Sequence, residues 1–215
     1  GKRLAAGRLT VIDATGPVAH WEPELATHSF EWLFAITHLA LLPDSVISLP
    51  TKGAINFHDG PLPGYAGLNT PAWALINGED GYGITWHMIT SGIDEGDVVA
   101  QARFDVAEGE TSLSLNTRNF EAAIETFGVL VDDITAGTLT STPQDTSATH
   151  RTYSRHDRPA ALAVLDWRRP AVELDRLVRG LTFGPYPNPL GLAKLLVGDD
   201  GQHDPDLYAE FAALQ

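Results

Sequence analysis

Two neighbouring apolar segments constrain the fold of this chain most strongly. Residues 29–36 are rich in aromatic and aliphatic side chains without polar alternation, which is typical of a central parallel strand buried on both faces. Residues 41–50 predict a loop and a short helix, which lead into a second strand at residues 54–58. Strand, short helix and strand in this order indicate an αβ repeat and therefore an α/β fold.

The rest of the chain carries further periodic segments. Residues 111–135 place apolar side chains at spacings of mostly three and four, which indicates an amphipathic helix packed on a sheet. Thr70 and Gly78 have the residue types of a helix N-cap and of the position after a helix end. The expected elements are strands at 9–13, 29–36, 54–58, 82–89 and 98–106 and helices at 70–78, 111–135, 166–181 and 204–215.

A boundary is expected near residue 150. Residues 138–149 are rich in Ser, Thr and Pro, as in a linker. We therefore expect a first domain at residues 1–149, and a linker with a second, small unit at residues 150–215. Residues 150–158 form a local basic patch, which we expect to be part of a solvated linker.

Composition excludes several classes of protein. The chain has 14 Lys and Arg against 28 Asp and Glu, and this net charge of −14 disfavours a nucleic-acid partner, because phosphate backbones are bound by clustered cations. It has no cysteine, hence no thiolate nucleophile and no cysteine-ligated zinc. No apolar run approaches the roughly 20 residues of a membrane helix, so we expect a cytoplasmic protein without a membrane partner.

The second strand ends in two polar side chains that point to chemistry. Strand alternation projects Asn56 and His58 on one face, and Gly60 and Pro61 then stop the strand. Catalytic groups are common at such strand ends, although a lone Asn-x-His also fits a structural histidine. His87 and the Gly/Asp-rich loop that carries Asp94 add a second polar cluster, which favours an active site.

Taken together, these residues resemble the formyltransferases that use 10-formyltetrahydrofolate, a family that includes glycinamide ribonucleotide transformylase and methionyl-tRNA formyltransferase. The resemblance implies a Rossmann-like fold with a mostly parallel central sheet and a small, truncated C-terminal subdomain. It also implies that the catalytic domain lacks part of its N-terminus and that the chain is an excerpt of a longer polypeptide. The residues that match the family pattern are Asn56, His58, Leu62, Pro63, Gly67, His87 and Asp94.

The resemblance assigns roles to the polar residues. Asn56 is expected to stabilise the oxyanion that forms when an amine attacks the formyl carbon. His58 is expected to move the proton, with Asp94 orienting the imidazole and His87 in an auxiliary role. Neither a metal nor a nucleophilic side chain is needed.

The co-substrate implied by the resemblance is 10-formyltetrahydrofolate, held largely by backbone groups of two loops. A flat pterin ring needs an apolar slot with convergent N–H and C=O groups, which the turn at residues 40–43 is expected to provide. The residues that we expect to bind it are Ile36, Ala40, Leu41, Leu42, Thr90, Gly92, Ile93 and Asp94.

The loop after His58 bears on the acceptor amine. Gly64 and Ala66 stand where the tRNA branch favours basic residues, which with the acidic composition argues against methionyl-tRNA. The run from Asn56 to Asn69 looks more like formylation domains of nonribosomal peptide and hybrid polyketide assembly lines. The expected partners are then an aminoacyl carrier protein and neighbouring assembly-line domains, and a nucleotide-linked amino sugar is the nearest alternative acceptor.

Two other functional classes stay open at the level of sequence. A metal-dependent hydrolase could use five residues, although none of them shows the spacing of a histidine-rich metal helix. A catalytically inactive interaction module that keeps the fold is the second alternative. The five residues are His58, Asp59, His87, Asp94 and Asp97.

Overall fold

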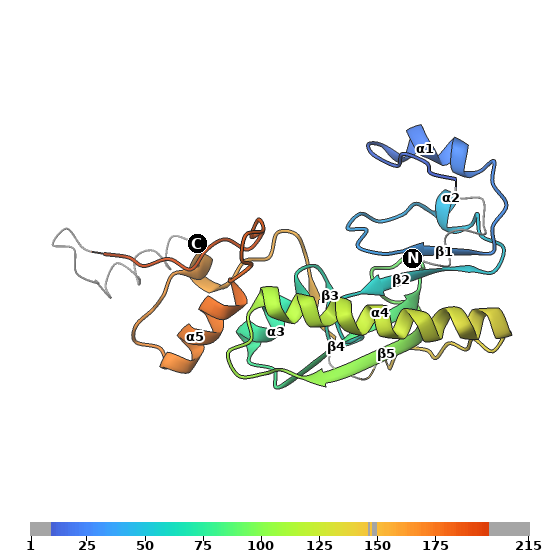
Figure 1. Cartoon of the computed structure of the whole chain (residues 1–215). Coiled ribbons are helices and arrows are strands. Elements are labelled where there is room, and N and C mark those ends of the chain that lie inside the picture. The colour runs from blue at the N-terminus through green and yellow to red at the C-terminus, as the bar shows by residue number, and fades with distance from the viewer. Residues whose placement is uncertain (1–9, 146, 148–149, 198–215) are drawn as a thin grey trace.

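A four-stranded sheet with the order β1-β2-β4-β5 lies at the centre of the computed structural model, which describes residues 10–145, 147 and 150–197 (Figure 1). β1 and β2 are parallel, and the other two pairs are antiparallel. A second sheet consists of two short parallel strands, β3 and β6. The strands are β1 (Trp32–Ala35), β2 (Gly53–His58), β3 (Ala66–Gly67), β4 (Gly81–Met88), β5 (Val98–Asp105) and β6 (Thr152–Tyr153).

The longest helix, α4, runs along one face of the main sheet (Figure 1). It begins with a capping box, in which Thr111 and Ser114 satisfy each other's backbone N–H, and it ends at Gly137 with φ +70°. The helices are α1 (Val18–Leu25), α2 (Asp44–Ile47), α3 (Thr70–Asn77), α4 (Ser112–Ala136), the 3-10 turn η1 (Ala160–Ala163) and α5 (Ala171–Gly180).

The main core lies between the sheet and α4. Ile55 and Phe57 of β2 point into it, because strand alternation sends them to the face opposite to that of Asn56 and His58. Trp86 of β4 is 1% exposed, and its indole N–H donates to the Thr126 hydroxyl of α4 at 2.9 Å. The buried members of this core are Ile55, Phe57, Ile84, Trp86, Ala123 and Leu130.

A second apolar core joins α3 and α5. Trp73 and Leu75 of α3 pack with Leu177 and Leu181, which lie in α5 and directly after it. In Figure 1, α3 and α5 lie beside each other at one end of the molecule. This core fastens the part of the chain beyond residue 150 to the sheet-bearing part.

The α/β class and most elements are confirmed, but four expectations need correction. The segment expected as a strand at 9–13 forms no strand over residues 10–13, because Val11 is 81% exposed and no strand pairs with it among the described residues. The first long strand is shortened to β1, which is only partly buried because it lies at the edge of the described sheet.

The other two corrections concern helix starts. Asn69 and not Thr70 is the N-cap of α3, since the Thr70 hydroxyl bonds to Asp59 instead. The helix expected at 166–181 begins after Pro170. The helix expected at 204–215 lies outside the described residues.

Candidate active site

The sheet brings Asn56 and His87 together at its centre. In the strand register, Asn56 of β2 pairs with Ala35 of β1 on one side and with His87 of β4 on the other. Asn56 Nδ2 lies 3.1 Å from His87 Nε2. Two polar side chains far apart in the sequence therefore share one level of the sheet.

His58, the last residue of β2, is fixed by the loop that follows it. Its Nε2 lies 2.7 Å from the carbonyl oxygen of Tyr65, and because that oxygen can only accept, Nε2 carries a proton. Its Nδ1 faces Oδ2 of Asp94 at 3.5 Å, which is too long for a direct hydrogen bond. In the neutral ring Nδ1 is therefore the basic atom.

Asp94 lies between both imidazoles. Its Oδ2 accepts the Gly67 backbone N–H at 2.8 Å, and its Oδ1 lies 3.3 Å from His87 Nε2. Burial raises the pKa of the carboxyl, but the hydrogen bond from His87 and the charge of His58 act against burial. With the Gly67 N–H they hold the pKa of Asp94 below its ordinary value, so the group is a carboxylate at neutral pH.

The protonation of His87 and the orientation of the Asn56 amide are linked. His87 Nδ1 lies 2.9 Å from the Met88 carbonyl and must donate to it. When His87 Nε2 carries no proton, it accepts a hydrogen bond from one Nδ2–H of Asn56. When Nε2 is protonated, it donates to the Asp94 carboxylate, and the Asn56 amide turns its oxygen toward the imidazole. In either state at least one N–H of Asn56 is left for a substrate oxygen.

Asp59, next to His58, is a half-buried residue whose carboxyl has a raised pKa, whereas that of Asp94 is lowered. Burial raises its pKa, and the nearby charge of His58 and a hydrogen bond from the Thr70 hydroxyl at 3.2 Å offset this in part. Its backbone carbonyl accepts from the Tyr82 hydroxyl at 2.8 Å and from Asn119 Nδ2 at 3.1 Å. This network anchors the turn directly after β2.

Asp59→Asn is expected to gain stability over the wild type as pH rises. Because the pKa of Asp59 is higher in the folded than in the unfolded protein, its protonated form stabilises the wild-type fold at pH values below the unfolded pKa. The wild type loses this stabilisation as pH rises through the folded pKa, whereas the asparagine variant does not titrate. The difference in Tm between variant and wild type should therefore grow from about pH 4 upward. Thermal unfolding across pH measures it, with Asp132→Asn on the exposed side of α4 as a control; a flat or falling difference would contradict the assignment.

The residues expected to hold the co-substrate lie in two loops, one directly after β1 and the other between β4 and β5. Ile36 directly follows the strand residue that pairs with Asn56, and it is 46% exposed. Leu41 is 70% exposed and Ile93, next to Asp94, is 45% exposed. Ala40 and Thr90 are exposed as well, whereas Leu42 and Gly92 are half-buried. A flat ring with polar edges needs apolar side chains of this kind, and the folate site at these two loops stays a prediction.

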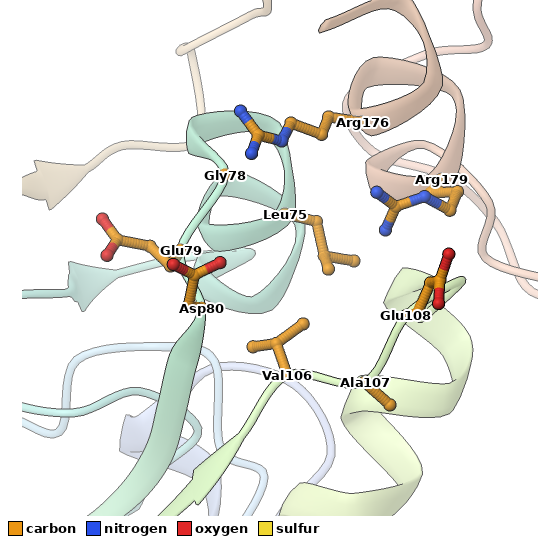
Figure 2. A pocket seen from close by; sticks show the side chains of 9 residues that line it. All are labelled: Leu75, Gly78, Glu79, Asp80, Val106, Ala107, Glu108, Arg176 and Arg179. Atoms are coloured by element: carbon orange, nitrogen blue, oxygen red, sulfur yellow. The ribbon is translucent and has the colours of Figure 1, made fainter. Parts of the chain in front are cut away.

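A separate cavity lies away from these residues. It has a volume of about 250 Å³ and lies between α3, α5 and the β5–α4 loop (Figure 2). None of the predicted site residues lines it. Its charged lining residues are Glu79, Asp80, Glu108, Arg176 and Arg179.

Among the described residues, no group of three or more His, Cys, Asp or Glu side chains is arranged to hold a metal ion.

Sequence reasoning does not single out the backbone groups that complete the site. The Tyr65 carbonyl and the Gly67 N–H each bond one member of the His58–Asp94 pair. The sequence marks Gly67 only as part of the glycine and proline framework, because a backbone group leaves no signal of its own in a sequence.

The chain belongs to the formyl transferase family. The family model described as formyl transferase matches residues 20–128, which is half of the chain and includes every predicted site residue. No described helix is long and apolar enough to span a membrane.

Solved structures with this fold agree with the assignment. A 4-N formyltransferase from Francisella tularensis has 22% sequence identity and a TM-score of 0.66, over 80% of this chain and 68% of that chain. An N-formyltransferase from Helicobacter canadensis, solved with folinic acid and dTDP-3-aminofucose, has 22% identity and a TM-score of 0.56, over 65% of this chain and 52% of that one. HypX from Aquifex aeolicus, solved with tetrahydrofolic acid, has 23% identity and a TM-score of 0.61, over 72% of this chain. The chain thus spans about half of the Helicobacter protein and 26% of HypX.

Proposed function

We propose that this chain transfers a formyl group from 10-formyltetrahydrofolate to the amino group of an aminoacyl thioester on a carrier protein. The observation that carries the transfer step is the grouping of Asn56, His58 and Asp94 near the end of β2, where Asp94 faces the imidazoles of His58 and His87 and His87 contacts Asn56. Two of the similar structures, from Helicobacter and Aquifex, were solved with folates, which supports a folate as the donor.

The chemistry of each side chain supports formyl transfer. The folate supplies an activated formyl group. Asn56 has an N–H left to donate to an oxygen on which negative charge develops. His58 Nδ1 is free to accept the proton that the attacking amine must lose. Asp94 stays ionised, so it stabilises the imidazolium that forms and keeps the ring oriented.

The loop after His58 supports an acceptor without a polyanion. Gly64 has no side chain that could bind a polyanion, and it lies half-buried directly before Tyr65. Ala66 carries less weight than the sequence alone indicates, because it is fully buried in β3 and a longer side chain there would not reach an acceptor. The net charge of −14 also opposes a tRNA substrate.

A nucleotide-linked amino sugar is the second candidate acceptor. The Helicobacter structure contains such a sugar, dTDP-3-aminofucose, and its fold matches this chain. An amino sugar and an aminoacyl thioester both present a primary amine, so the side chains around His58 serve either one.

An acceptor panel tests the proposal. The chain is incubated with 10-formyltetrahydrofolate and, separately, with an aminoacyl carrier protein, an amino-sugar nucleotide and methionyl-tRNA, and each product is weighed by mass spectrometry. We expect a gain of one formyl group on the carrier-bound amino acid, and none when the carrier carries no amino acid. Formylation of the sugar nucleotide or of methionyl-tRNA alone would contradict the proposed acceptor.

A further inference from the structure

The short strand β6 fixes the backbone direction of the loop that holds the catalytic pair. The N–H of Ala66 donates to the carbonyl of Arg151 and the N–H of Leu68 donates to the carbonyl of Tyr153, both at 2.8 Å. Successive N–H groups of an extended chain point to opposite sides. The N–H of Gly67, between them, therefore points away from β6, and it is this N–H that binds Asp94.

Gly67 and Tyr153 are in close contact. Gly67 has φ +88°, and a Cβ at this position would collide with the backbone of Tyr153. Glycine is thus required twice, for the left-handed backbone and for the approach of the two strands. The pairing of β3 with β6 leaves no room for a side chain here.

An aromatic stack anchors β6 in turn. The Tyr153 ring stacks on Trp73 of α3 at 4.8 Å and 8° and on Tyr65 at 5.8 Å and 23°. Asn77 Nδ2 donates to the Tyr153 hydroxyl at 2.8 Å and to the Tyr65 hydroxyl at 3.0 Å. Tyr65 is the residue whose carbonyl accepts from His58, so this stack includes a residue that makes a catalytic contact.

Gln144 holds the second loop. Its Nε2 donates to the carbonyl of Asp94 at 2.7 Å and to the carbonyl of Gly96 at 2.8 Å. Asp94 has φ +53°, a left-handed backbone that is uncommon for a non-glycine residue, although aspartate adopts it more readily than most. Thr142, two residues before Gln144, is tied to Val98 by two backbone hydrogen bonds of 2.8 Å.

We propose that Gln144 and β6 are positioning elements of the active site, which set the distance between the His58 imidazole and the Asp94 carboxylate through the two loops that they clamp. Both lie after α4, in a region that composition alone predicts to be a linker. Their importance for turnover rests on the proposed function, but their effect on the geometry of Asp94 does not.

Gly67→Ala is the sharpest test, with Gly109→Ala as its matched control. Gly109 has φ +76°, and no atom lies within 4 Å of the place that an alanine Cβ would take, so alanine there meets the same backbone strain without a collision. Displacing a catalytic group by about 1 Å costs about 100-fold in rate, so we expect kcat of Gly67→Ala to fall about 100-fold while KM for the amine changes little. Gly109→Ala should keep both constants.

A second readout is independent of turnover. Titration of the Asp94 carboxyl by ¹³C NMR should give a higher pKa in Gly67→Ala and in Gln144→Met than in the wild type, because each displaces one of the two loops and so separates the carboxylate from the Gly67 N–H and the imidazoles that stabilise it. If Gly67→Ala does not fold, Gln144→Met and Tyr153→Ala carry the test. An unchanged Asp94 titration in the folded variants, or an equal loss of kcat in Gly109→Ala, would overturn the proposal. A wild type that formylates no amine would refute the proposed function, yet the NMR result would still decide the positioning role.

Discussion

His58→Ala is expected to slow formyl transfer by about 10² to 10⁴-fold, the usual contribution of a positioned general base or acid. The structure identifies the atom involved, since Nε2 is committed to the Tyr65 carbonyl and leaves Nδ1 to receive the proton. The alanine variant removes this acceptor without disturbing the main core, because His58 lies on the face of β2 opposite to Ile55 and Phe57.

Steady-state kinetics with 10-formyltetrahydrofolate and the amine measures this effect. His28→Ala is the control, because His28 is exposed and lies in the turn after α1. Near wild-type turnover in His58→Ala would show that another group moves the proton and that His58 is structural.

Asn56→Ala is expected to lower kcat by about 10² to 10³-fold, as loss of one oxyanion donor does in other acyl transfers. The amide is well placed for this role because it stays neutral and keeps an N–H that His87 does not use. The donor acts on charge that appears only in the transition state, so KM should change much less than kcat.

The comparison variant for Asn56 is Asn116→Ala, which removes a half-buried amide from α4 that is not among the predicted site residues. Equal kcat values for Asn56→Ala and the wild type would rule out the donor role. A loss confined to KM would instead make Asn56 a ground-state binding residue.

The regular elements can be predicted from the sequence because each leaves a local pattern. The alternation at residues 54–58 predicts the strand and the shared face of Asn56 and His58, and the spacing at 111–135 predicts α4 to within one residue at each end. The edge position of β1 cannot be predicted in this way, because continuous apolarity does not say how many strands flank a segment. α1 cannot be predicted from the sequence, because it contains Pro23, which usually breaks a helix, and because its single buried residue, Trp21, leaves no apolar periodicity.

The contacts that complete the site could not be predicted, because they join segments far apart in the sequence. β3 and β6 have two residues each, too few for any periodicity, and their pairing connects residues 66 and 152. Gln144 acts on backbone carbonyls, which every residue has. The acidity of Asp94 likewise depends on how its loop returns to His58, His87 and Gly67.

The measurement that tests the central claim most directly follows the formyl carbon itself. The wild-type chain and His58→Ala are each given 10-formyltetrahydrofolate with a ¹³C-labelled formyl group and an aminoacyl carrier protein, and the label and tetrahydrofolate are measured together. The account predicts that the wild type moves the label to the amine with an equal amount of tetrahydrofolate, and that His58→Ala does so at least about 100-fold more slowly. Release of the label as formate with the amine unmodified, or no consumption of the folate in the presence of the aminoacyl carrier protein, would contradict it.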